Sequence, residues 1–240
     1  VRPASGRARP DRIDSASPSP MSIAIVRTRG LSGMYAPQVT VEVHLANGLP
    51  SFTLVGLPDT EVRESRERVR AALLTSRFEF PTRRITVNLA PADLPKESGR
   101  FDLPIALGIL AATGQIPTRT LDQYEFAGEL SLTGELRPVR GTLAMAYAVS
   151  RSEHTVGPRR GFVVPDESAD EAALVGGIPI FPARTLLQVV EHLRAEAGDT
   201  SAQAITEHHA MVRLTPPIYP DLFDVKGQLA ARRAIEVAAA

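Results

Sequence analysis

Cysteine is absent from this 240-residue chain, which excludes disulfide bonds, thiolate catalysis and cysteine-ligated zinc sites. Long apolar runs are absent too, because none reaches the roughly 18 residues that a membrane-spanning helix needs. The first twenty residues are rich in Pro, Ser and Arg and carry no apolar signal core. We therefore expect a cytoplasmic protein with no membrane partner.

An excess of one charge sign is also missing, because Lys and Arg total 27 and Asp and Glu total 27. No whole-chain positive field attracts nucleic acid, so any DNA contact has to come from local clustering of charge. With 43% hydrophobic residues, the chain can bury one sizeable core, or one core plus an extension.

A phosphate-binding loop of the GxxxxGK[ST] type is not found in the sequence. The nearest glycine-basic cluster, GPRRG at 157–161, lacks the Lys-Ser/Thr pair and precedes a strand, so a surface turn is favoured there. Metal binding is not indicated, because the five histidines are spread over a strand, two helix ends and a linker: His44, His154, His192, His208 and His209. We expect no cofactor or metal site in this chain.

Composition and periodicity divide the chain into four parts. Residues 1–20 have almost no large apolar side chain and are expected to be disordered. Residues 21–197 alternate between strand and helix patterns and are expected to form an α/β (α+β) domain. Residues 198–220 lose this periodicity and resemble a linker, and 221–240 contain a helix that runs into the chain end without a cap.

The strand and helix patterns within the domain can be placed individually. Strands are predicted at 22–28, 39–46, 52–57, 84–90, 162–165 and 178–181, with two short strands around Thr133-Gly134. Helices are predicted at 60–77, 102–114, 142–152, 167–175 and 184–196. Asn47-Gly48 is typical of a hairpin turn between the second and third strands. The helix after Asp102 is apolar all round, which predicts a buried position, with Asp102 as its cap.

Basic side chains on the first helix are the main candidate for a binding site. Arg63, Arg66 and Arg70 lie at i, i+3 and i+7, so they share one face and can meet phosphates or a partner. Glu64 and Glu67 interleave with them, and intrahelical pairing on a solvated face explains the pattern equally well.

The loop before the buried helix raises two further questions. Lys96 and Arg100 are candidates for the same DNA or partner contact. Lys96 and Ser98 also suggest a Ser-Lys hydrolase, because a serine nucleophile needs a neutral base nearby. The two residues are only two positions apart, so solvated loop residues are favoured over a catalytic pair.

Three long runs of sequence carry a family resemblance. GLPDTEVRESRERVRAALLTS, FPTRRITVNLAPADLPKESGRFDLPIALGILAATG and FAGELSLTGELRPVRGTLAMA resemble the YifB/ComM family of magnesium-chelatase-like AAA+ ATPases, and the resemblance covers 21–240. It implies an N-terminal domain with a fold like the Lon protease domain and the ribosomal protein S5 domain 2. The run DLFDVKGQLAARRAIEVAAA resembles the first helix of the ATPase module, just before Walker A, so we expect a chain that stops before the ATP site.

The resemblance also tests the hydrolase hypothesis by position. In Lon-type domains the catalytic serine would fall on Arg100, and the catalytic lysine near Leu143. Neither chemical group is present, so the resemblance implies no catalytic residue and no peptidase activity here. Arg100 also departs from the small residue expected at this place in the family, so we expect the surface of this loop to be particular to this protein.

The function that the resemblance implies belongs to a full-length protein. It is a hexameric ring that binds ATP and Mg²⁺ and acts on DNA, in helicase or branch-migration work during DNA uptake and recombination. The segment in hand would help to assemble the ring or guide DNA, without chemistry of its own. A stand-alone protein-interaction domain and a divergent Ser-Lys hydrolase remain the alternatives.

Overall fold

The computed structural model describes residues 23–152, 160–210 and 221–239, in two compact units divided between Ala210 and Met211. The expected disordered extension at 1–20, His154, and positions 157–159 and 211–220 lie outside these ranges. The α/β fold class is confirmed by the first unit, which contains a four-stranded sheet, a three-stranded sheet and a two-stranded hairpin. No helix among the described residues is both long enough and apolar enough to cross a membrane.

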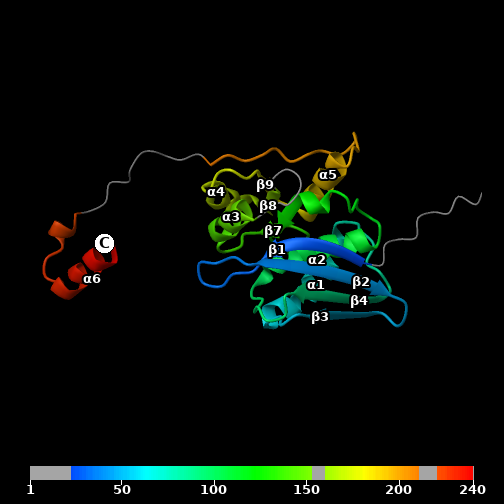
Figure 1. Ribbon diagram of the computed structural model, residues 1–240, viewed down its shortest axis with the longest axis horizontal. Coiled ribbons are helices and arrows are strands. Elements are labelled where there is room, and N and C mark those ends of the chain that lie inside the picture. The colour runs from blue at the N-terminus through cyan, green and yellow to red at the C-terminus, as the bar shows by residue number, and fades with distance from the viewer. Residues whose placement is uncertain (1–22, 153–159, 211–220, 240) are drawn as a thin grey trace, which may run out of the picture. The chain divides into compact units, whose positions relative to one another are not determined.

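The largest sheet has the strand order β1-β2-β4-β3 (Figure 1). Its strands are β1 (Ile23–Arg29), β2 (Gln38–Ala46), β4 (Arg84–Ala90) and β3 (Ser51–Val55). Apolar side chains alternate along β2, and Val39, Val41 and Val43 are fully buried on its inner face. All four strands lie close to their predicted positions.

The predicted hairpin at Asn47-Gly48 is wrong. The chain does turn there, but β3 pairs with β4 in parallel, and β4 lies between β2 and β3 in the sheet. The helix α1 (Thr60–Thr75) connects the two parallel strands, as parallel pairing requires a crossover. The Asn-Gly pair is a local turn signal, so it cannot indicate that β4, a later segment of the chain, lies between β2 and β3.

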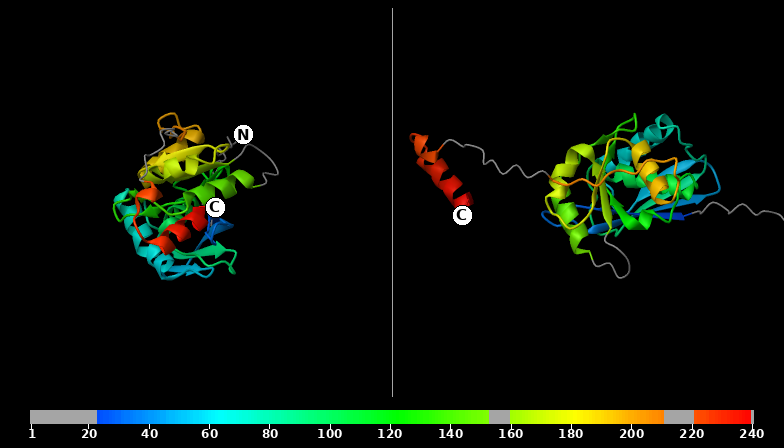
Figure 2. Two further views of the ribbon diagram at one scale, coloured as in Figure 1. Left: turned by 90° about the vertical axis from the view of Figure 1, so that its left-hand side faces the viewer. Right: turned by 90° about the horizontal axis from the view of Figure 1, so that it is seen from above.

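Two helices cover the inner face of this sheet (Figures 1 and 2). The helix α1 begins where the side chain of Asp59 accepts a hydrogen bond from Val62 N–H at 2.8 Å and caps the first turn. The helix α2 (Asp102–Ala112) is buried along its whole length, so its predicted central position is confirmed. At Gly108, α2 approaches β2 so closely that a Cβ atom would lie 2.5 Å from Val43 Cγ2.

The second half of the unit alternates strand and helix, as predicted. Its parallel sheet has the order β5-β8-β9, and the hairpin β6-β7 turns at Thr133-Gly134. The bounds are β5 (Tyr124–Phe126), β6 (Glu129–Leu130), β7 (Leu136–Arg137), α3 (Thr142–Arg151), β8 (Gly161–Pro165), α4 (Ala169–Ala173), β9 (Ile180–Ala183) and α5 (Leu186–Glu196).

The first unit continues past residue 197, where the sequence pattern suggested a boundary. Ile205 is buried in the main core, and its N–H donates to His192 Nδ1 at 3.1 Å. His208 N–H donates to the carbonyl of Ile180 on β9 at 2.8 Å. These contacts fasten the segment 199–210 to the domain although its sequence has no helical or strand period.

The second unit contains a short 3-10 turn and the helix α6 (Leu229–Ala239). None of its described side chains is buried, and Leu229, Ile235 and Val237 are all more than half exposed. Burial of these residues therefore requires a surface from outside this unit.

Candidate functional site

The outer face of α1 presents the three arginines that the sequence singles out. The inner face of the helix packs Val62, Val69 and Leu73 into the core. Arg63, Arg66 and Arg70 are all exposed on the opposite side. Their placement follows from the helical period, because positions three and four residues apart share a face.

Two of these arginines line a hollow between α1 and the start of β3. Arg66 and Arg70 meet Arg83, from the loop before β4, around a space of about 280 Å³. Arg63 does not reach it. We call this space the arginine groove; its lining residues are Pro50, Ser51, Phe52, Arg66, Glu67, Arg70, Phe80, Pro81 and Arg83.

Aromatic contacts hold one of the arginines in place. Phe52 and Phe80 stack with their ring centres 6.4 Å apart and their planes at 12°. The guanidinium of Arg70 lies 5.4 Å from the centre of the Phe80 ring, a cation–π distance. Arg66 pairs with its neighbour Glu67 at 2.9 Å, but both side chains are more than half exposed, so this pair is weak and easily exchanged for another anion.

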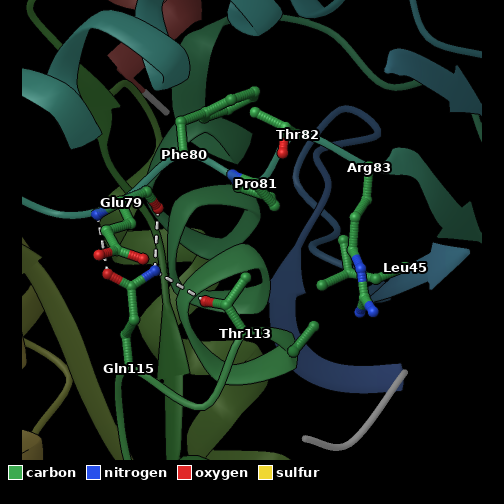
Figure 3. A pocket seen from close by; sticks show the side chains of 9 residues that line it. Leu45, Glu79, Phe80, Pro81, Thr82, Arg83, Thr113 and Gln115 are labelled. Carbon is green, nitrogen blue, oxygen red and sulfur yellow. Dashed lines mark hydrogen bonds between the residues drawn. The ribbon is translucent and has the colours of Figure 1, made fainter. Parts of the chain in front are cut away.

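The loop at 79–83 forms one wall of the groove and is anchored on its other side (Figure 3). Gln115, just beyond α2, accepts a hydrogen bond from Glu79 N–H at 2.8 Å and donates to the Glu79 carbonyl at 2.9 Å. A second hollow of about 510 Å³ lies between this loop and the end of α2, and it shares Phe80 and Arg83 with the arginine groove. The two hydrogen bonds fix the start of the loop that lines both hollows.

Lys96 and Arg100 lie inside the protein, not at the surface where the sequence-based hypothesis placed them. Lys96 is 0% exposed and donates from Nζ to the carbonyl of Pro91, and Arg100 is 6% exposed. Burial lowers the pKa of both side chains, against the opposing attraction of nearby carboxylates. The expectation of a solvated Lys96 is wrong, because the loop folds back beside Pro58 and covers the side chain.

The same loop argues against a serine nucleophile. Ser98 Oγ accepts a hydrogen bond from Arg100 Nε at 2.8 Å. A guanidinium has no free lone pair and cannot take a proton from the serine. Lys96 Nζ donates instead to the carbonyl of Pro91, so the structure does not assemble the pair that the hydrolase alternative needs.

Asp102 has a larger role than the cap predicted for it. Phe101 occupies the cap position, and Asp102 binds Arg68 through two hydrogen bonds of 2.6 and 3.1 Å and accepts from Leu130 N–H at 3.2 Å. Burial raises the pKa of Asp102 to about 6, while Arg68 counteracts the shift. The pair fastens α1 to α2. Sequence analysis missed Arg68, although its spacing of two residues from both Arg66 and Arg70 places it on the opposite side of the helix.

Comparison with known proteins identifies the family of this chain. The family model "Subunit ChlI of Mg-chelatase" matches residues 41–168, which include β3, α1, the arginine groove and α2. This chain belongs to the magnesium-chelatase ChlI family. Within it, the chain is 48% identical over 220 residues to competence protein ComM of Haemophilus influenzae, covering 92% of this chain and 42% of ComM.

Two further relatives place the chain in the YifB/ComM group of that family. It is 44% identical over 220 residues to YifB of Salmonella typhimurium and 42% identical over 226 residues to YifB of Escherichia coli, in each case covering 92% of this chain and 41% of the relative. The chain thus spans about two fifths of the length of the curated relatives that it matches.

The family is named after a magnesium chelatase, but the part of this chain that the structure describes contains no cluster of metal-binding side chains. No three His, Asp or Glu side chains there converge as metal ligands. His192 is buried between Tyr124 and Phe181, with ring centres 5.1 and 4.8 Å away, and His208 pairs with Asp170 at 2.7 Å. The arginine groove is the candidate site, because it brings two of the arginines that the sequence singles out together with Arg83.

Proposed function

We propose that this chain is the accessory domain of a YifB/ComM-type motor, and that it binds an anionic partner of that motor through the arginine groove. The full-length protein, in this proposal, forms a hexameric ring, binds ATP and Mg²⁺, and acts on DNA as a helicase or in branch migration during DNA uptake and recombination. The printed name of the Haemophilus influenzae relative supports the competence role. The domain itself contributes binding without chemistry.

The observation that supports this function is the convergence of three guanidinium groups on one space. Arg66, Arg70 and Arg83 come from two segments of the chain, and only one carboxylate, that of Glu67, lies among them in the groove. The groove thus carries an excess of positive charge in a chain whose total charge is zero. Anions gain most where several donors converge in a concave surface that partly excludes water.

The test uses the full-length protein with Arg66→Glu and Arg70→Glu together. We expect ATP hydrolysis in the absence of DNA to stay within about twofold of wild type, because the substitutions lie on an exposed helix face and the chain contains no phosphate-binding loop. The rate of DNA unwinding or branch migration should fall by about tenfold or more. The matched control is Arg63→Glu, which changes charge on the same helix outside the groove. Equal effects of the control and the double substitution would contradict the proposal.

A second candidate is direct guidance of DNA by α1. Arg63 extends the row of Arg66 and Arg70 beyond the groove, as contact with successive phosphates requires. In that case DNA binding should weaken as salt rises, and replacement of all three arginines by Ala should reduce both the affinity and the salt dependence. Salt-independent binding, or no change in the variant, would remove this candidate.

The hydrolase alternative has its own test. A serine-directed acylating probe should leave Ser98 unlabelled, because its hydroxyl is bound to Arg100 and has no base beside it. Mass spectrometry of the treated chain reads this out, and an acyl adduct on Ser98 would restore the hydrolase hypothesis.

A further inference from the structure

Strand β3 forms an outer edge of the large sheet, at the bottom of Figure 1, and its edge is open. It pairs with β4 on one side, and no strand within the described ranges pairs with the other. Natural edge strands usually carry charges, internal prolines or bulges that prevent further pairing. The sequence from Leu49 to Gly56, LPSFTLVG, has no charged residue, and its one proline precedes the strand.

The backbone groups that face outward on this edge can be identified. Ser51 N–H points toward β4, where it donates to the carbonyl of Arg83 at 3.4 Å. Because successive residues of a strand direct their N–H and C=O groups to opposite sides, Thr53 and Val55 also face β4. The N–H and C=O groups of Phe52 and Leu54 therefore face outward, and they can accept one additional strand.

The open edge and the arginine groove adjoin each other. Ser51 and Phe52, at the start of β3, line the same hollow as Arg66, Arg70 and Arg83. A strand added to β3 would direct every second side chain toward α1, over this hollow. Carboxylates at those positions would compete with the exposed Glu67 for Arg66 and would supply partners for Arg70 and Arg83.

This combination selects among occupants. A second copy of the chain paired edge to edge would bring its own Arg66 and Arg70 toward the first set, and like charges oppose that. DNA satisfies the arginines but has no alternating amide and carbonyl groups for Phe52 and Leu54. An acidic peptide in extended conformation satisfies both.

We propose that the β3 edge and the arginine groove together bind an extended, acidic segment of a partner polypeptide by strand addition. This rests on the proposed function, in which the groove binds an anionic partner, and it specifies that partner's chemistry. Backbone hydrogen bonds to Phe52 and Leu54 supply part of the affinity, and carboxylates over the groove supply the selectivity.

The first test is equilibrium binding of the 240-residue chain to a labelled peptide of about ten residues in which Glu and Val alternate. Two control peptides carry Lys in place of Glu, or N-methyl groups on every second amide so that the outward ladder cannot form. We expect the Glu peptide to bind and each control to bind at least about tenfold more weakly.

Three variants locate the site. Arg66→Glu with Arg70→Glu should weaken peptide binding by about tenfold or more, while Arg63→Glu should change it by less than about threefold. Leu54→Pro removes an outward N–H and should abolish binding, since edge strands tolerate proline where the N–H faces solvent. If Leu54→Pro fails to fold by circular dichroism, amide hydrogen exchange on the wild-type chain replaces it: exchange at Phe52 and Leu54 should be fast in the free chain and slow with peptide bound.

The outcomes separate this inference from the proposed function. Equal binding of the N-methylated peptide, or no protection at Phe52 and Leu54, overturns strand addition and leaves anion binding by the groove intact. A single-stranded oligonucleotide is the competing ligand. If it displaces the peptide, and if its own binding is lost in Arg66→Glu/Arg70→Glu, the partner is DNA and the peptide proposal is overturned. If neither ligand responds to those substitutions, the proposed function fails as well.

Discussion

The buried ion pair between Arg29 and Glu125 yields the most quantitative prediction from this structure. Arg29 on β1 donates from Nε and Nη2 to the two carboxylate oxygens of Glu125 on β5, at 2.6 and 2.7 Å. The side chains are 6% and 0% exposed. The pair joins the large sheet to the parallel sheet across 96 positions of sequence. Loss of the pair should therefore lower the free energy of unfolding of the whole first unit.

The perturbation is Glu125→Leu. It leaves the Arg29 guanidinium buried with two neutral partners, the carbonyl of Ala36 and the hydroxyl of Ser152. Removal of one partner of a buried pair costs about 3–5 kcal/mol, mostly because the remaining charge is uncompensated. Replacement of both residues, Arg29→Met with Glu125→Leu, should recover at least about 2 kcal/mol of that loss, since no buried charge of the pair remains.

Urea unfolding followed by circular dichroism measures both variants, with equal slopes required for the comparison. Arg160, whose Nη1 lies 3.8 Å from Glu125 Oε1, is more exposed than Arg29 and also donates from Nε to the carbonyl of Asp122, so it depends less on Glu125. A loss below about 1 kcal/mol for Glu125→Leu would refute the reasoning. So would a double variant as unstable as the sum of the two single ones, because the two residues would then act independently.

Three further predictions test other parts of the unit. Gly108→Ala should destabilise the domain by about 1–3 kcal/mol in urea unfolding, because the 2.5 Å approach to Val43 outweighs the roughly 1 kcal/mol gain in helix propensity; a more stable variant would show that α2 can shift. Burial raises the pKa of Asp102 from 3.8 to about 6, so the wild type should lose stability relative to Asp102→Asn as pH rises from 3.8 to about 6, and a relative gain over that range would contradict the shift. Burial lowers the pKa of His192 below 6.5, so the stability that neutral His192 gives the fold is present above pH 6.5 and is lost as the pH falls through the lowered pKa. Amide hydrogen exchange at Ile205, corrected for the intrinsic rate, should therefore become faster on acidification, because its N–H donates to His192 Nδ1. Constant protection would contradict the role of His192 as acceptor.

Sequence patterns predict the local elements of this fold well. The alternation on β2 and the apolar composition of α2 each reflect a single environment that a short segment meets along its length. The pairing of β3 was predicted wrongly because it depends on β4, which the Asn47-Gly48 turn signal does not include. The same limit applies to the segment 199–210, where isolated contacts such as Ile205 with His192 leave no period to detect.

The candidate site was only half visible in the sequence for the same reason. Arg66 and Arg70 lie on one helix face, so their spacing identifies them. Arg83 and the aromatic stack join them from other segments, and no spacing rule connects those positions. The burial of Lys96 and Arg100 was missed because a polar loop sequence is ordinarily solvated, and only the folded loop shows what covers it.

The most direct test of the proposed role compares ATP hydrolysis and DNA processing by the full-length protein with and without residues 23–210. If residues 23–210 form an accessory domain without chemistry, the shortened protein should still hydrolyse ATP but should no longer unwind DNA or drive branch migration. ATP hydrolysis by the 240-residue chain alone, or undiminished DNA processing by the shortened protein, would contradict the account.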